Sequence, residues 1–137
     1  MKKIIGPGIA AGVAMLVIAG LLGFLFAALF PSLKEEYTNA NLFRPFSDPL
    51  VWLMYVAPVI AGLVLAWIWN AVKDGIKCDT ACKKWAYFGL GYWALTIPGM
   101  VISLGTFPVS FLMVATWTVG NLAQAFVGAW VLSKLNK

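Results

Sequence analysis

The sequence has 137 residues and a net charge of +5; 62% of the residues are hydrophobic, 11% are charged, and the mean hydropathy is +0.89. Soluble domains are typically about 25% charged, so this composition predicts an integral membrane protein with a single domain over residues 1–137. Histidine is absent, which excludes zinc, copper and haem sites built on imidazole and catalytic sites that use a histidine base.

Four uncharged stretches are long enough to cross a membrane, because a spanning helix needs about 20 apolar residues. The predicted spans are residues 4–30, 50–72, 85–104 and 108–132, joined by an outer loop at 31–49, an inner loop at 73–84 and a tight turn at 105–107. The predicted fold is therefore all-α: an integral membrane four-helix bundle whose helices run antiparallel in an up-down order.

Small residues follow one side of the first span. Residues on this side recur at spacings of four or three: they are Gly8, Gly12, Met15, Ala19 and Gly23. Small side chains allow the backbones of two membrane helices to approach closely. We expect this close-packing seam to hold the first span against the protein's own helices; a dimer interface is the alternative.

The outer loop begins with a helix signal. Ser32 and Glu35 have the spacing of a capping box, in which the side chain of each residue accepts a hydrogen bond from the backbone N–H of the other. This spacing predicts one short surface helix over residues 33–37.

The end of the outer loop reads Arg-Pro-Phe-Ser-Asp-Pro over residues 44–49. Asp48 is placed to cap the second span and can pair with Arg44 across the turn. We interpret this segment as a turn that starts the helix, with its phenylalanines in the membrane interface. A docking or ligand-gripping loop is the alternative, with Arg44, Phe46 and Asp48 as the interaction candidates.

The inner loop holds Cys78 and Cys82, the only cysteines in the chain. Spacing of four residues puts both thiols on one helical face, and neighbouring lysines favour the thiolate, so a redox pair is one reading. Against it, the chain has no second cysteine pair and no C-x-x-C, so it cannot complete a four-ligand metal site. Cytoplasmic thiols are also ordinarily reduced. We interpret the segment as an ordinary inner loop.

Polar residues lie inside the third and fourth spans. Asn121 and Gln124 sit near the middle of the fourth, where an unpaired amide is costly because lipid offers no hydrogen bonds. The third span presents side chains that are able to pair with them. We therefore expect a polar core that packs the helices together, made of Tyr92, Thr96, Ser103, Trp117, Asn121 and Gln124.

The basic residues predict the topology. Eight of them flank the inner side, against Lys34 and Arg44 outside; the eight are Lys2, Lys3, Lys73, Lys77, Lys83, Lys84, Lys134 and Lys137. By the positive-inside rule, both termini and the cysteines face the cytoplasm, in the cytoplasmic (inner) membrane. Because these lysines adjoin apolar spans, we assign them to topology and lipid headgroups and expect no nucleic-acid partner.

Two stretches carry a resemblance: residues 42–50, Leu-Phe-Arg-Pro-Phe-Ser-Asp-Pro-Leu, and residues 97–117, which contain Pro-Gly-Met and Phe-Pro-Val-Ser and end in Trp. They resemble a group of small, uncharacterised bacterial four-span membrane proteins. Members share an aromatic-Arg-Pro-aromatic-Ser-Asp-Pro start to the second span and a Pro-Gly-Met bend. The resemblance covers most of the chain from Leu42 onward and implies no activity, and the cysteine pair lies outside it.

These observations lead to three hypotheses about function. The first is a non-enzymatic accessory subunit or partner-binding bundle, whose partners are the bilayer and other membrane subunits or a second copy, without cofactor or metal. The alternative is a bundle that binds or carries a lipid or small molecule in a pocket between spans two, three and four. A thiol-disulfide redox protein using Cys78 and Cys82 is the third.

Overall fold

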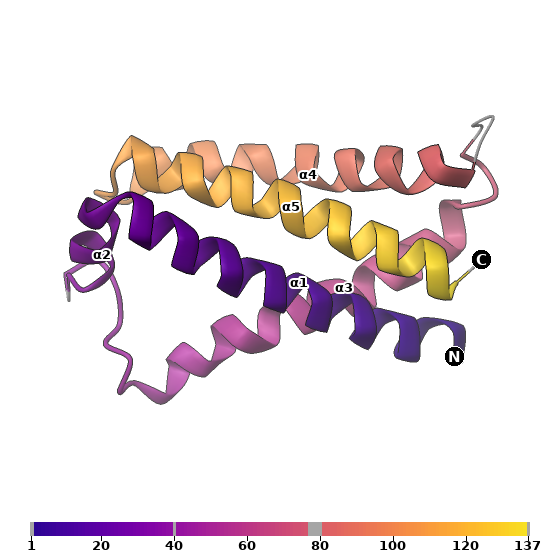
Figure 1. The fold of residues 1–137 in the computed structure, drawn as a ribbon, viewed down its shortest axis with the longest axis horizontal. Helices are drawn as coiled ribbons and strands as arrows, with labels where there is room; N and C mark the ends of the chain where they lie inside the picture. Colours follow the sequence, from indigo (N-terminus) through magenta and orange to yellow (C-terminus); the bar gives the residue numbers. More distant parts are fainter. Residues whose placement is uncertain (1, 40, 77–80, 137) are drawn as a thin grey trace.

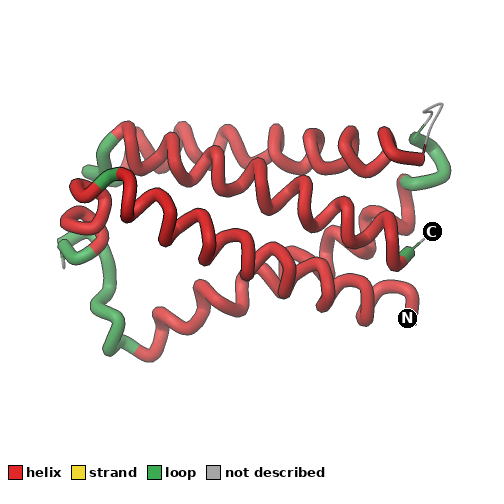
Figure 2. Tube along the Cα trace, viewed as in Figure 1, coloured by secondary structure: helices red, strands yellow, loops and turns green. Residues whose placement is uncertain are grey.

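The computed structural model describes every residue except 1, 40, 77–80 and 137 (Figure 1). All regular secondary structure in the described chain is helical; turns and loops join the helices, and the described residues form no strand (Figure 2). Its elements in order are the α-helices α1 (Lys2–Leu29) and α2 (Pro31–Tyr37), the 3-10 helix η1 (Pro49–Trp52), and the α-helices α3 (Leu53–Val72), α4 (Ala81–Thr106) and α5 (Phe111–Leu135).

Within the described chain, four helical segments are long and apolar enough to cross a membrane: Ile4–Leu29, Pro49–Val72, Lys84–Thr106 and Phe111–Leu135. The expected helix in each apolar stretch is thus confirmed, and the chain has the make-up of a multi-pass membrane protein. The fourth helix begins later than expected. Ser110 is its N-cap, and the Ser110 hydroxyl accepts a hydrogen bond from the Met113 N–H at 3.1 Å, so residues 108–110 stay outside the helix.

The short helix in the outer loop is confirmed as α2, but the capping box is wrong. The N-cap residue is Phe30, which makes no side-chain hydrogen bond to the helix. Pro31 occupies the first helical position instead, where its missing N–H costs nothing and its fixed φ angle favours the helix.

The chain reverses direction after each long helix, which gives the molecule two distinct ends (Figure 1). The terminal end holds both termini and the connection from α3 to α4; the loop end holds α2, the rest of the outer loop and the turn from α4 to α5. In the middle, α1 packs against α3 and α5, and α5 packs in turn against α4. The helices therefore follow one another in the order α3, α1, α5, α4.

The largest group of buried apolar side chains lies near the terminal end. Ala11 and Met15 of α1, Leu65, Ala66 and Trp69 of α3 and Leu132 of α5 form one cluster. The Trp69 ring meets the Phe88 ring of α4 edge to face, with 5.1 Å between centroids. Trp69 also donates a hydrogen bond from its indole N–H to the backbone carbonyl of Asn136 at 2.9 Å, which fixes the C-terminus of α5 against α3.

The first half of the close-packing seam brings two backbones into contact. A Cβ atom added at Gly12 would lie 2.5 Å from the Cα of Val59, and one added at Gly8 would lie 2.8 Å from the Cα of Leu63. Gly62 of α3 fits between these two glycines in the same way. The seam is thus used inside the chain at Gly8 and Gly12, as expected in preference to a dimer.

The second half of the seam differs from the expectation. A Cβ atom at Gly23 would meet no atom within 4 Å, whereas at Gly128 of α5 it would meet the Met15 sulfur at 2.8 Å. Close packing therefore ends at the contact between Met15 and Gly128. Beyond that point, Ala19 and Gly23 face open space because no helix approaches them closely.

The glycine contact yields a stability prediction. Replacing Gly12 with Ala forces a methyl group into the α3 backbone, so we expect Gly12→Ala to lower the free energy of unfolding by about 1–3 kcal/mol. Gly20→Ala is the matched control: Gly20 lies on the same helix, and a Cβ atom added there would meet no atom within 4 Å. Unfolding in mixed detergent micelles measures both. Equal stability of the two variants would contradict the backbone contact.

Candidate functional site

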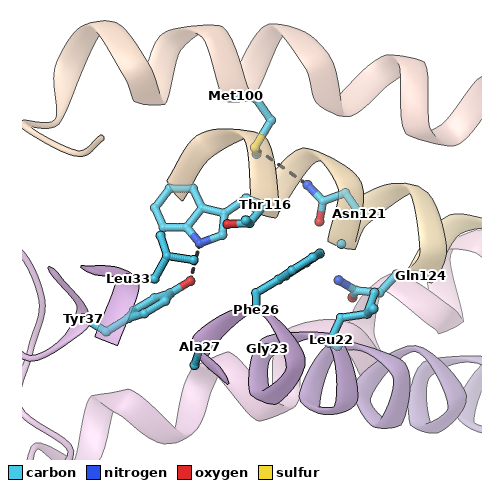
Figure 3. Close-up of a pocket in the computed structure, with 13 residues that line it drawn as sticks. Leu22, Gly23, Phe26, Ala27, Leu33, Tyr37, Met100, Thr116, Asn121 and Gln124 are labelled. Carbon is cyan, nitrogen blue, oxygen red and sulfur yellow. Dashed lines mark hydrogen bonds between the residues drawn. The ribbon is translucent and has the colours of Figure 1, made fainter. Parts of the chain in front are cut away.

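A cavity of about 340 Å³ lies at the loop-end half of the molecule, between α1 and α5 (Figure 3). The α1 wall consists of small and apolar residues: Ala19, Leu22, Gly23, Phe26 and Ala27. The α5 wall carries the polar groups, while Leu33 and Tyr37 of α2 and Met100 of α4 complete the lining. The small residues that continue the seam past Met15 leave this space open.

The helices around the cavity differ from those expected. The pocket hypothesis places it between spans two, three and four, but α3, which forms span two, contributes no lining residue. Span one supplies a whole wall instead, because α5 packs on α1 rather than on α3. Met100 is the contribution of span three.

Asn121 and Gln124 both line the cavity, and neither pairs with the hydroxyls expected to satisfy them. The Asn121 amide nitrogen lies 3.8 Å from the Met100 sulfur, a weak acceptor. Gln124 makes no side-chain hydrogen bond to any described residue. In Figure 3 both amides lie beside the open space. The α5 wall therefore offers unused hydrogen-bonding capacity to whatever fills the cavity.

The third span does not form the expected polar core with these amides. The Thr96 hydroxyl donates to the Trp93 carbonyl at 2.7 Å, and the Ser103 hydroxyl donates to the Gly99 carbonyl at 2.8 Å. Hydroxyls on a helix can bond a carbonyl of their own preceding turn, which leaves them no need of a partner helix. Tyr92 packs instead against the buried cluster near the terminal end.

Trp117 links α5 to α2 at the end of the cavity. Its indole N–H donates to the Tyr37 hydroxyl oxygen at 2.6 Å, and the Phe43 ring stands edge-on to the Trp117 ring. Burial raises the pKa of the Tyr37 hydroxyl above its ordinary value; the hydrogen bond from Trp117 opposes this shift, and the Glu36 carboxylate adds to it. Tyr37 therefore stays protonated at neutral pH and keeps its own hydrogen to donate.

Glu36 ties the same short helix to the start of α5. Its two carboxylate oxygens accept hydrogen bonds from the Ser110 N–H at 2.5 Å and from the Ser110 hydroxyl at 2.7 Å. A negative charge is favourable at a helix N-terminus, where backbone N–H groups lack partners. Sequence reasoning missed Glu36 and Tyr37, because no spacing rule connects residues 74 or 80 positions apart.

The expected geometry of residues 44–50 is confirmed. Arg44 and Asp48 form an ion pair at 2.7 Å, and the other Asp48 oxygen accepts the Leu50 N–H at 2.9 Å. These two bonds hold the pKa of Asp48 below its ordinary value. Phe46 is 72% exposed. None of these three interaction candidates lines the cavity, so their role in docking stays a prediction.

A second cavity of about 280 Å³ also has Trp117 in its lining. Its lining comes from the outer loop and the α4–α5 turn, and includes Phe43 and Pro108. Trp117 therefore borders both cavities, whereas Tyr37, which accepts the Trp117 hydrogen bond, lines only the first.

The described residues support no metal site and do not test the redox pair. Among the described residues, no three histidine, cysteine or carboxylate side chains gather as metal ligands do. Cys78 lies outside the described residues, and only the helical position of Cys82, in the first turn of α4, is described. The redox hypothesis stays a prediction.

Comparisons of the chain with protein-family models, curated proteins and solved structures found no match. The resemblance of residues 42–50 and 97–117 to small four-span bacterial membrane proteins therefore stays a prediction. The function has to be argued from the cavity and the residues around it.

The docking of α2 leads to a prediction about local opening. Glu36→Ala removes both bonds to Ser110, and charged hydrogen bonds at an exposed site stabilise by roughly 1 kcal/mol, so we expect α2 amides to exchange about five times faster with deuterium. Glu35→Ala is the matched control, since it removes the same charge from the same helix without removing a side-chain bond to a described residue. Hydrogen exchange that is equally fast in both variants would refute the docking role.

Proposed function

We propose that the protein spans the cytoplasmic membrane as an antiparallel four-helix bundle with both termini in the cytoplasm. The charges at the two ends support this orientation. Towards the terminal end, the described helices carry Lys2, Lys3, Lys83, Lys84 and Lys134, and Lys73 directly follows α3; the loop end carries Lys34 and Arg44.

Within this bundle, we propose that the cavity between α1 and α5 binds a small molecule taken from the membrane. The observation that carries the proposal is the pair of amides, Asn121 and Gln124, which line the cavity opposite an apolar wall. Ligand sites are mostly apolar spaces of about 300–1,000 Å³ with a few polar groups that fix the ligand's orientation. A cavity of about 340 Å³ with this lining fits that description.

The role proposed for the cavity is binding or carrying, without catalysis. No Asp, Glu, Lys or Arg belongs to its lining. General acid–base chemistry needs a group that titrates near the working pH, and Tyr37, the titratable residue at the cavity, has its pKa raised still further from neutrality by burial. The lining is suited to hydrogen bonding and apolar contact.

The hypothesis of an accessory subunit has its own supporting observation. Beyond the glycine contact, α3 diverges from α1 towards the loop end (Figure 1). The residues at its start are widely exposed: Trp52, the last residue of η1, by 70% and Leu53, the first residue of α3, by 60%. A transmembrane helix of a partner subunit, or a second copy, would cover this face. Native mass spectrometry of the protein released from nanodiscs tests this role: we expect the mass of a complex with a partner, and the mass of a lone monomer would contradict it.

Filling the cavity tests the binding proposal. We expect Gly23→Leu to remove any small molecule that co-purifies with the protein, because the new side chain enters open space that lines the cavity. Gly20→Leu is the matched control: it also meets open space, but outside the cavity. Native mass spectrometry from nanodiscs reads the bound mass. An identical ligand on both variants, or none on the unaltered chain, would sink the proposal.

The topology has a separate test with a thiol reagent that cannot cross the membrane. We expect Cys78 and Cys82 to stay unlabelled in intact cells and to react after lysis. The control replaces both cysteines with Ser and introduces Ser47→Cys in the outer loop, which should react in intact cells. Labelling of the native cysteines before lysis would reverse the orientation.

A further inference from the structure

We propose that the ligand of the cavity is an uncharged amphiphile whose compact head carries a carbonyl or hydroxyl oxygen, bound against the amides of Gln124 and Asn121. This inference rests on the proposed binding function and names the chemistry of its ligand. Three properties of the lining lead to it: its charge, its unused hydrogen-bonding groups and its size.

The charge of the lining selects an uncharged head. No ionised side chain lines the cavity, and the nearest carboxylate along α2, that of Glu36, is engaged with Ser110. An ion moved from water into such a site would lose its hydration without gaining a counter-charge, which is strongly unfavourable inside a membrane. A phosphate, carboxylate or ammonium head is therefore disfavoured.

The hydrogen-bonding groups select an oxygen-bearing head. The Thr116 hydroxyl has no hydrogen left to donate, since it donates to the Met113 carbonyl at 2.8 Å. Three groups keep unused capacity: the Tyr37 O–H, the Asn121 carbonyl and the whole Gln124 amide. Primary amides both donate and accept, and a tyrosine hydroxyl that has accepted one bond can still donate. A carbonyl or hydroxyl oxygen matches these groups, and a pure hydrocarbon leaves them unpaired.

The shape and size of the cavity set how the molecule lies. Apolar side chains of α1, among them Leu22 and Phe26, face the amide-bearing wall of α5 (Figure 3). Its volume of about 340 Å³ equals that of roughly eleven water molecules in the liquid. This space holds one compact head and the start of a chain, so a whole two-tailed lipid does not fit inside. The apolar tail must leave the cavity towards the bilayer.

Two kinds of membrane molecule share this chemistry: quinones, through ring carbonyls, and neutral glycerides, through ester and hydroxyl oxygens. The test uses the full chain in detergent micelles, with binding of three probes followed by native mass spectrometry. The probes are a short-chain benzoquinone, dioctanoylglycerol and dioctanoylphosphatidic acid, which carries the phosphate head. We expect one of the neutral probes to bind at least tenfold more tightly than the phosphate probe. The tighter neutral probe identifies the source.

Variants connect the binding to the named groups. Gln124→Met keeps the length of the side chain and removes its amide, and we expect it to weaken the neutral probe about five- to tenfold, with Asn121→Leu acting in the same direction. Thr118→Val is the control, because Thr118 lies on α5 outside the cavity and bonds the Val114 carbonyl. An unchanged helical circular dichroism spectrum is required of each variant that is scored.

The outcomes separate the two proposals. If no probe binds, or if Gly23→Leu leaves binding unchanged, the cavity is not a binding site and both proposals fail. If Gly23→Leu abolishes binding while the phosphate probe binds as tightly as the neutral ones, the cavity stands and the inference about the ligand is wrong. That inference is also wrong if the amide variants bind the neutral probe as tightly as the unaltered chain does.

Discussion

The close contact of α1 with α3 at Gly8, Gly12 and Gly62 is the constraint on which the rest of the arrangement depends. The two backbones touch there, and the helices separate from this point towards the loop end (Figure 1). With α3 turned away, the second half of α1 faces α5 across the cavity, and the contact of Met15 with Gly128 marks where their close packing ends. The cavity is the space that these two contacts leave behind.

The short helix α2 both lines the cavity and bonds the start of α5. Glu36 supplies acceptors for the Ser110 N–H and hydroxyl, and the adjacent Tyr37 accepts a hydrogen bond from Trp117, further along α5. One segment thus stabilises a helix terminus and completes the cavity wall. These three bonds lie at the exposed loop end, and exposed hydrogen bonds are typical of segments that open locally at low free energy. Opening there would expose the cavity without disturbing the buried cluster near the terminal end.

Composition and short-range spacing predicted the helices and the Asp48 cap, but they did not predict which residues contact one another between helices. The four apolar helices, the Asp48 cap and the pair with Arg44 follow from composition and short spacings. The seam looked uniform in the sequence, yet Gly12 touches a backbone and Gly23 touches nothing, because packing depends on where the opposing helix runs. The hydroxyls expected to satisfy the amides found acceptors in their own helices, and the bonds of Glu36 and Tyr37 join segments that no periodicity relates.

Under the proposed binding function, the amides of α5 are groups whose partner is not part of the chain. At membrane depth, a polar group without a partner raises the free energy of the folded state, and an Asn or Gln replaced by an apolar residue would avoid that cost. Here the amides lie opposite Ala19 and Gly23, residues too small to cover them. An occupant that bonds the amides removes the cost and binds only the folded state, so by linkage it also stabilises the fold in proportion to its concentration. Binding and stability are then two measures of the same contact.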